Sequence, residues 1–226
     1  MTALNAFLKD PKEFLWAHLL QQPQAKAPHL SFGTVIHAAL EKRNLAWQQG
    51  VTTQDLIKTF EELLMQREVF TEKEREYYLH AGRLLLTRYG EETAQDHPII
   101  LSAERALTAR LDDIPLFGKV DRIDLLKKDG QNCRIIDYKT GNPKKTPEAI
   151  RKDDGLFRQL VFYKLLCDLS PSFSHTATVF TLDFVGNEKE GRRLIDFEVT
   201  EQEVNELKEL IKNVWKKIVT LDFTKL

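Results

Sequence analysis

The hydrophobic pattern of the chain changes from helical to strand-like at Pro98, and this change limits the folds that are available to it. Before Pro98, apolar residues recur at helical spacing, with an interruption at Pro11. After it we expect strands at 99–111, 116–126, 134–139, 176–185 and 193–199, with helices at 155–169 and over the last segment. This order predicts a mixed α/β fold that begins with a largely helical portion.

Three helix starts can be located from residue types alone. Thr71 with Glu74, and Thr200 with Glu203, have the spacing of a capping box, in which side chain and backbone of the two residues bond reciprocally. Ser31 is a natural N-cap for a helix through His37, Leu40 and Glu41. We therefore expect helices to begin directly after these positions.

Composition and charge exclude several classes of protein. The net charge is −1, from 33 basic and 34 acidic residues, so the overall charge of the chain does not attract nucleic acid. Any contact with nucleic acid would need a local basic surface, metal ions or a partner chain. Only Cys133 and Cys167 are present, which excludes a disulfide framework or a four-cysteine metal site built by this chain alone. No apolar run approaches the roughly 20 residues of a membrane span. We expect no membrane partner and a cytoplasmic location.

The chemistry-bearing residues lie in two strands that the sequence pairs as a hairpin around residues 127–132. Residues whose numbers sum to about 258 then face one another, so Asp121 lies opposite Asp137, and Lys139 shares a strand face with Asp137. Two facing carboxylates repel unless a cation lies between them, and Mg²⁺ or Mn²⁺ prefers carboxylate oxygens. Carboxylates, a divalent metal and a lysine together suit the hydrolysis of a phosphodiester.

The same residues also have a structural interpretation. An Asp-x-Lys sequence on a strand is common, and exposed hairpins often carry such charges on a solvated face. A single helical histidine such as His37 is more often a structural residue than a metal ligand. Asp124 alternates to the face opposite Asp121, and we expect it to be structural. Composition and spacing alone leave both interpretations open.

Five motifs, in order, resemble those of the PD-(D/E)XK nuclease superfamily, and within it the RecB-like branch. They are residues 33–37 (Gly-x-x-x-His), Glu104 on the strand before the hairpin, residues 118–124 (Gly-x-x-Asp-Arg-x-Asp), residues 137–139 (Asp-Tyr-Lys) and residues 159–163 (Gln-x-x-x-Tyr). The resemblance implies a restriction-endonuclease-like mixed β-sheet flanked by helices. Residues 1–226 would form one nuclease domain, with a mostly helical part at 1–97 and the nuclease core at 98–226.

The resemblance also implies a role for each matching residue. The metal ligands would be His37, Asp121 and Asp137, holding Mg²⁺ or Mn²⁺. Lys139 would be the catalytic lysine, acting with the two aspartates, and Glu104 would help to organise metal or water.

Further residues are expected to support the site or to contact DNA. Gln159 and Tyr163 lie four residues apart and therefore on one helix face. The resemblance implies that they support the site or contact DNA. Without the resemblance, we would interpret them as residues at the edge of the core. A basic surface near the site is expected, and solvated turns with paired charges are the alternative. Its members would be Lys119, Arg122, Lys144, Lys145, Arg151, Lys152 and Arg158.

The chain departs from the family pattern at its two ends. Many relatives carry an iron–sulfur cluster, held by one cysteine near the N-terminus and three near the C-terminus. Here Asp10 stands where the first cysteine would be, and residues 222–226 contain no cysteine. We expect no cluster, and instead expect hydrophobic packing between the N-terminal and C-terminal helices.

The function implied is that of a metal-dependent deoxyribonuclease, an exonuclease in DNA end processing, repair or recombination. No Gly-x-x-x-x-Gly-Lys-[Ser/Thr] loop occurs, so a helicase domain or subunit is the expected partner that moves the DNA. The alternative is a catalytically inactive nuclease-like module that binds DNA or serves assembly. Loss of motif residues would be its signature, but Asp121, Asp137 and Lys139 are all present.

Overall fold

The computed structural model describes residues 2–23, 27–51, 55–67, 69–128, 130–141, 146–152, 155–186 and 191–224. The chain starts with the helices α1 (Thr2–Lys9), α2 (Pro11–Phe14), the π-helix η1 (Leu15–Leu19), α3 (Pro28–Gln48), α4 (Leu56–Met65) and α5 (Glu72–Glu92). There follow β1 (Ile99–Leu111), β2 (Ile114–Leu125), β3 (Asn132–Lys139), α6 (Pro147–Arg151), α7 (Leu156–Leu169), β4 (Thr176–Phe184), β5 (Arg193–Phe197) and α8 (Glu201–Val219). The predicted order of helices and strands is confirmed.

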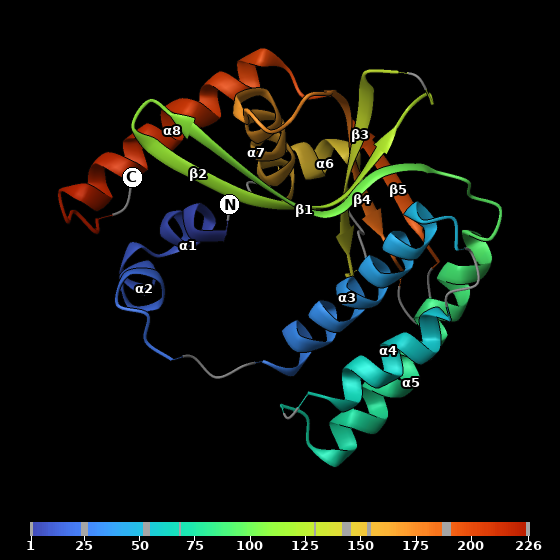
Figure 1. Ribbon diagram of the computed structural model, residues 1–226. Coiled ribbons are helices and arrows are strands. Elements are labelled where there is room, and N and C mark those ends of the chain that lie inside the picture. Colours follow the sequence, from blue (N-terminus) through green and yellow to red (C-terminus); the bar gives the residue numbers. More distant parts are fainter. Residues whose placement is uncertain are drawn as a thin grey trace.

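The five strands form one mixed sheet in the order β1-β2-β3-β4-β5 (Figure 1). Only β3 and β4 run parallel, with α6 and α7 in the connection between them, and the other neighbours are antiparallel. The pairs Ile123–Ile135 and Leu125–Cys133 confirm the predicted register of the β2–β3 hairpin. Helices cover both faces of this sheet, and the long β1–β2 hairpin extends beyond them beneath α8.

Each face of the sheet has its own hydrophobic core. Ile135 on β3 packs into the core shared with α7 and α8, and its neighbour Ile136 packs into the core shared with α3, α4 and α5. This alternation follows from the two-residue repeat of a strand. Among the described helices none is long and apolar enough to cross a membrane.

The N-terminal and C-terminal helices pack together as predicted. Phe7 and Phe14 form a cluster with Val214 of α8, and the two phenylalanine rings meet edge to face with centroids 5.4 Å apart. Asp10 is the N-cap of α2, where its carboxylate accepts the backbone N–H groups of Lys12 and Glu13 at 2.9 and 3.2 Å. A helix cap therefore occupies the position at which the resemblance would have placed a cysteine.

Both predicted capping boxes are present, at Thr71 with Glu74 and at Thr200 with Glu203. The prediction that Ser31 caps a helix is wrong. Helix α3 begins three residues earlier, at Pro28, because proline lacks the N–H that the first turn would leave unpaired and its fixed φ already suits a helix.

Candidate active site

The motif residues of the hairpin meet where β2 and β3 separate. Arg122 and Ile136 form the pair nearest the site in the β2–β3 ladder, while β3 continues alongside β4 as far as Lys139. Beyond this pair the carboxylate of Asp121 takes the place of a backbone partner, and its Oδ2 accepts the N–H of Tyr138 at 2.7 Å. Asp121 is thereby held against the strand that carries Asp137.

A first group of side chains consists of His37 from α3, Glu104 from β1 and Asp121 from β2. His37 Nδ1 lies 3.3 Å from Asp121 Oδ2, and one ligand atom from each of the three residues lies within 4.8 Å of the others. Glu104 has a φ of 50°, a left-handed conformation that costs a residue with a side chain about 1–3 kcal/mol. Its carboxylate forms an ion pair with Lys119.

A second group surrounds the buried carboxylate of Asp137. Its Oδ2 lies 2.5 Å from Lys139 Nζ, and its Oδ1 accepts the amide N–H of Gln159 at 2.7 Å. Gln159 Oε1 in turn accepts from Lys139 Nζ at 2.8 Å, so the amide fixes both members of the pair. The hydroxyl oxygen of Tyr163 lies 3.1 Å from both Asp137 Oδ1 and the Lys119 carbonyl oxygen. Gln159 and Tyr163 thus support Asp137 directly.

Negative charge exceeds positive charge in this part of the molecule. Burial raises the pKa of Asp137 in spite of Lys139, and burial likewise raises the pKa of Glu104 in spite of Lys119. Burial alone would lower the pKa of His37, but its hydrogen bond to Asp121 and the charges of Asp121 and Asp137 together raise it above 6.5. Such an excess of negative charge would be relieved by a cation.

The first group fits a divalent cation. An imidazole nitrogen and two carboxylate oxygens form a donor set that Mn²⁺ and Mg²⁺ accept. The structure places Glu104 with His37 and Asp121 in this group, whereas both oxygens of Asp137 are engaged by the second group. The assignment of Asp137 as a metal ligand stays a prediction.

Both groups border one cavity of about 840 Å³. His37, Asp121, Asp137, Lys139 and Gln159 are all among the residues that line it. Gly33, the first residue of the histidine motif, lets α3 approach the sheet closely, because a Cβ at Gly33 would lie 3.2 Å from the hydroxyl oxygen of Thr140, directly after β3.

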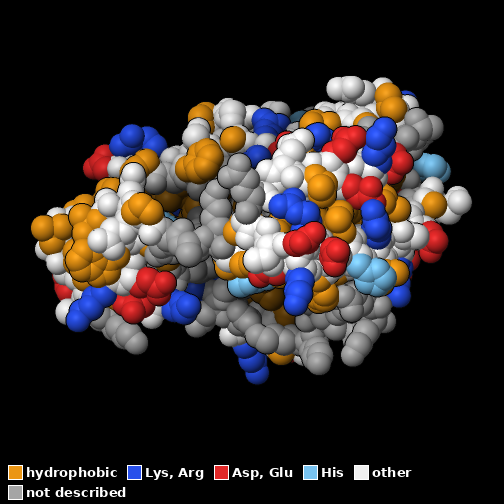
Figure 2. Space-filling view, turned by 90° about the horizontal axis from the view of Figure 1, so that it is seen from below, with side chains coloured by type: hydrophobic (Ala, Val, Ile, Leu, Met, Phe, Trp, Pro, Cys, Tyr) orange, Lys and Arg blue, Asp and Glu red, His pale blue; other side chains and the backbone are white. Residues whose placement is uncertain are grey.

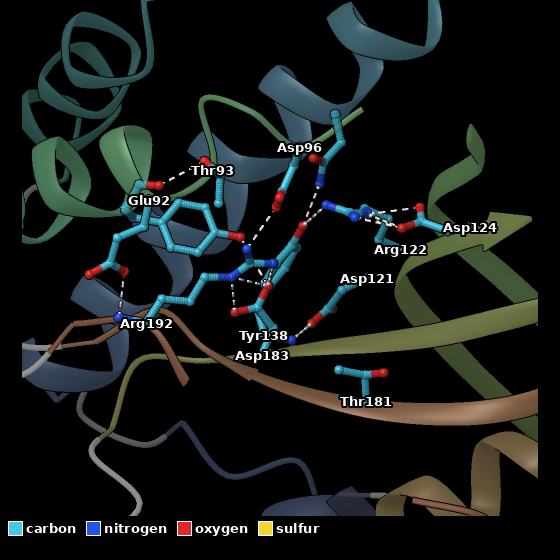
Figure 3. A network of polar contacts seen from close by, with 12 residues as sticks. Glu92, Thr93, Asp96, Asp121, Arg122, Asp124, Tyr138, Thr181, Asp183 and Arg192 are labelled. Carbon is cyan, nitrogen blue, oxygen red and sulfur yellow. Dashed lines mark hydrogen bonds and ion pairs between the residues drawn. The ribbon is translucent and has the colours of Figure 1, made fainter. Parts of the chain in front are cut away.

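The predicted surface position of Arg122 is wrong. Its side chain is buried, with its guanidinium bonded to both carboxylate oxygens of Asp124 and, at 3.1 Å, to the hydroxyl of Tyr138 (Figure 3). Asn44 donates to the same hydroxyl at 3.0 Å. Arg122 is buried because two partners on its own sheet satisfy the guanidinium away from water. The structural role predicted for Asp124 is confirmed.

Other members of the expected basic surface are also engaged. Lys119 pairs with Glu104, and Arg151 pairs with Glu203. Arg158 donates to the side chain of Asn5 at 2.9 Å. Lys144 and Lys145, which were expected to contact DNA, lie outside the described residues.

Sequence reasoning missed two supporting residues, and one of them left a signal. Asn44 lies seven residues after His37 and therefore on the same face of α3, which is the face toward the sheet. A polar residue in register with the histidine motif could have been recognised as part of it. Lys119 was expected at the surface, and half of its side chain is exposed there. Its pairing with Glu104 was missed, because that contact depends on the left-handed backbone of β1 at Glu104, which no local pattern predicts.

The fold and this arrangement of carboxylates and lysine define a nuclease of the restriction-endonuclease-like class. A model of the PD-(D/E)XK nuclease superfamily matches residues 1–225, and the chain belongs to this superfamily. Its members act on nucleic acid and use divalent metals. The resemblance predicted from the motifs is confirmed.

A solved structure agrees with this fold. The crystal structure of a candidate exonuclease from Eubacterium rectale superposes with a TM-score of 0.61 at 12% identity, covering 98% of this chain and 80% of that one. At this identity the similarity shows the fold alone. No curated protein sequence matches the chain.

Proposed function

We propose that this protein is a Mg²⁺- or Mn²⁺-dependent deoxyribonuclease, an exonuclease that processes DNA ends in repair or recombination. Residues 1–226 would act as a single nuclease domain in the cytoplasm. The observation that carries the proposal is that His37 and Asp121, which Glu104 joins in one group, line the same cavity as the pair Asp137–Lys139.

His37, Glu104 and Asp121 would hold the metal ion. When bound, a divalent ion neutralises the phosphate and lowers the pKa of the attacking water. Lys119 pairs with Glu104 and limits the repulsion between Glu104 and Asp121 before a metal binds. The backbone N–H of Tyr138 holds the Asp121 carboxylate in place.

Lys139 would act on the phosphate and the water. Asp137 and Gln159 hold its ammonium group at the cavity wall, so that its remaining hydrogen-bonding capacity is available to a bound phosphate oxygen or water. A positive group fixed in this way stabilises the charge that develops in the transition state. Gln159 sets the position of Lys139 because its amide bonds to the lysine at one end and to Asp137 at the other.

A helicase domain or subunit is the proposed partner. The net charge of −1 gives little general attraction for DNA. Lys119, Arg122 and Arg151 are committed to carboxylates within the chain, which further limits the charge that can hold a strand. Both observations support delivery of DNA by another chain or domain.

The test uses end-labelled single-stranded and duplex DNA, and a matched RNA strand, with Mg²⁺, Mn²⁺ or EDTA. We expect metal-dependent DNA cleavage by the wild type and none by Lys139→Ala. Lys164→Ala is the matched control, because Lys164 also pairs with an aspartate, at 2.6 Å from Asp168, but does not line the cavity. It should cleave as the wild type does.

Three results would contradict the proposal. Cleavage of RNA alone would exclude a deoxyribonuclease. Cleavage that survives Lys139→Ala would exclude this site. Metal binding without any cleavage, measured as a Mn²⁺-dependent rise in Tm that Asp121→Ala removes, would favour the inactive binding module.

A further inference from the structure

The cavity extends well beyond the catalytic groups. Its volume of about 840 Å³ lies near the upper end of the range for sites that enclose a drug-sized ligand. Among the described residues that line it, Asp121 and Asp137 are the only carboxylates, and both lie at one end. The other end is formed mostly by apolar and aromatic residues of β2, α8 and the N-terminal helices, together with Thr2 and His18.

Strand β2 connects the two ends. Phe117, Lys119 and Asp121 alternate along it, and all three line the cavity. At about 3.3 Å per residue, Phe117 lies about 13 Å from Asp121 along the strand. The Phe117 side chain is 62% exposed, which is unusual for a phenylalanine in the middle of a long strand.

Trp215 of α8 supplies a second aromatic surface. Its side chain is 36% exposed, and Val214 beside it packs against Phe7 and Phe14 of the N-terminal helices. Figure 2 shows a cluster of hydrophobic side chains, larger than any other in this view, at the end of the molecule that carries α2 and the end of α8, with charged side chains around it. The aromatic part of the cavity lies at this more hydrophobic end.

We propose that the aromatic end is a subsite for unpaired nucleobases, so that the substrate is a single-stranded DNA end. The inference rests on the proposed function, because the bases would belong to the strand whose phosphate lies between Asp121 and Lys139. Bases stack on aromatic side chains without regard to sequence, and only unstacked bases offer a free face. The aromatic end has no carboxylate to repel the strand and, among its described residues, no lysine or arginine to favour phosphate over base.

The test measures binding of a fluorescein-labelled oligothymidylate by anisotropy in Mg²⁺. The full chain carries Lys139→Ala, so that the strand is not cut, and Phe117→Ala or Trp215→Ala is added to it. Each addition should weaken binding about tenfold, within the range found when base–aromatic stacking is removed. Trp16→Ala is the matched control, because Trp16 is 49% exposed but does not line the cavity, and it should leave binding unchanged.

A second strand, in which abasic sugars replace the bases, tests the chemistry directly. It should bind the Lys139→Ala protein about tenfold more weakly, and Phe117→Ala should cause no further loss with this strand. Equal binding of the two strands, or unchanged binding after both aromatic substitutions, would overturn the subsite. The subsite would also be overturned if blunt-ended duplex DNA bound with the same dependence on Phe117.

Failure of the subsite is distinguishable from failure of the proposed function. If the wild type cleaves DNA in a manner that depends on Lys139, but the aromatic substitutions have no effect, only the subsite is overturned. If the wild type neither binds nor cleaves any DNA strand, both are overturned.

Discussion

Two groups of charged side chains lie next to each other on β2 and β3 and meet at Tyr138, and their contrast separates structural charge from functional charge. The cavity cluster consists of His37, Glu104, Asp121, Asp137 and Lys139 and borders the cavity. The closed network lies between the sheet and helices α3 and α5; its members are Arg43, Tyr89, Asp96, Arg122, Asp124, Asp183 and Arg192 (Figure 3).

Every carboxylate of the closed network pairs with an arginine of the same network. Asp183 is fully buried, yet it accepts two bonds from Arg192 at 3.0 and 2.8 Å and one from the hydroxyl of Tyr89 at 3.0 Å. Arg192 also pairs with Asp96 at 2.8 Å. Burial raises the pKa of Tyr89 well above its ordinary value, so the ring stays neutral and donates its proton to Asp183.

The cavity cluster is not balanced in this way. In the closed network each aspartate pairs with an arginine, whereas in the cavity cluster Glu104 and Asp137 pair with lysines and Asp121 has only the imidazole of His37 as an ion-pair partner among the described residues. The closed network therefore stabilises the fold by itself. The cavity cluster keeps negative charge that a bound cation would compensate. Three substitutions, in order of expected effect, test this distinction, and a fourth lies outside both groups.

The largest effect is expected from Asp121→Asn. The amide oxygen can still accept the Tyr138 N–H, but one charged ligand is lost, so we expect the cleavage rate to fall by about 10³-fold, as when a charge-stabilising group is removed. Tm should stay the same or rise, because repulsion from Asp137 is relieved. Cleavage kinetics and thermal unfolding measure the two effects. Asp124→Asn is the matched control on the same strand, and it should lower Tm instead.

The second-largest effect is expected from Asp183→Asn, as a loss of stability. It leaves the buried Arg192 without its main charged partner, and breaking such a pair costs about 3–5 kcal/mol. Urea unfolding should show this loss, while the cleavage rate per folded molecule remains that of the wild type. A loss of rate at unchanged stability would contradict the distinction between the two groups.

Tyr138→Phe tests whether the two groups are coupled. The hydroxyl accepts from Arg122 and Asn44 in the closed network, whereas the backbone N–H holds Asp121 in the cavity cluster. Removing the hydroxyl leaves two buried donors unpaired and should cost about 1–3 kcal/mol of stability. If the groups are independent, the apparent affinity for Mn²⁺ should not change; a tenfold weaker affinity would show coupling through Tyr138.

The smallest effect is expected from Glu203→Gln, outside both groups. Burial would raise the pKa of Glu203, but its bonds to Thr200 and its pairing with Arg151 lower it below the usual 4.5. A lowered pKa contributes stability that is present above pH 4.5 and is lost as the pH falls through the pKa of the folded state. We expect the variant to lose about 0.5–1 kcal/mol at pH 7 and to approach the wild type near pH 3 in thermal unfolding. An equal loss at both pH values would exclude the charge as its cause.

Much of the fold was predictable because it rests on local patterns. The capping boxes at Thr71 and Thr200 depend on residues three apart, and the pairing of Ile123 with Ile135 depends on the length of one turn. The helix start at Ser31 failed, although Pro28 was within reach of the same kind of reasoning. In that case a stronger local signal, proline at the first helical position, was overlooked.

The site was predictable as a set of residues and not as a set of contacts. The motifs identified His37, Asp121 and Lys139, because residue type and spacing are visible in the chain. They did not indicate that Arg122 turns inward to Asp124, or that Lys119 pairs with Glu104. The direction of each of these side chains depends on a bend or a packed layer formed by distant segments.

The amino-acid sequence alone determined the order of the elements, the hairpin register and the superfamily, since each follows from neighbouring residues or from short motifs. The packing of distant segments determined which charges are closed off and which face the cavity, and it brought Phe117 and Trp215 to the same cavity as Asp121. The physical reason is that burial and charge compensation are properties of the whole packed chain, and are absent until β2, α3 and α8 have come together.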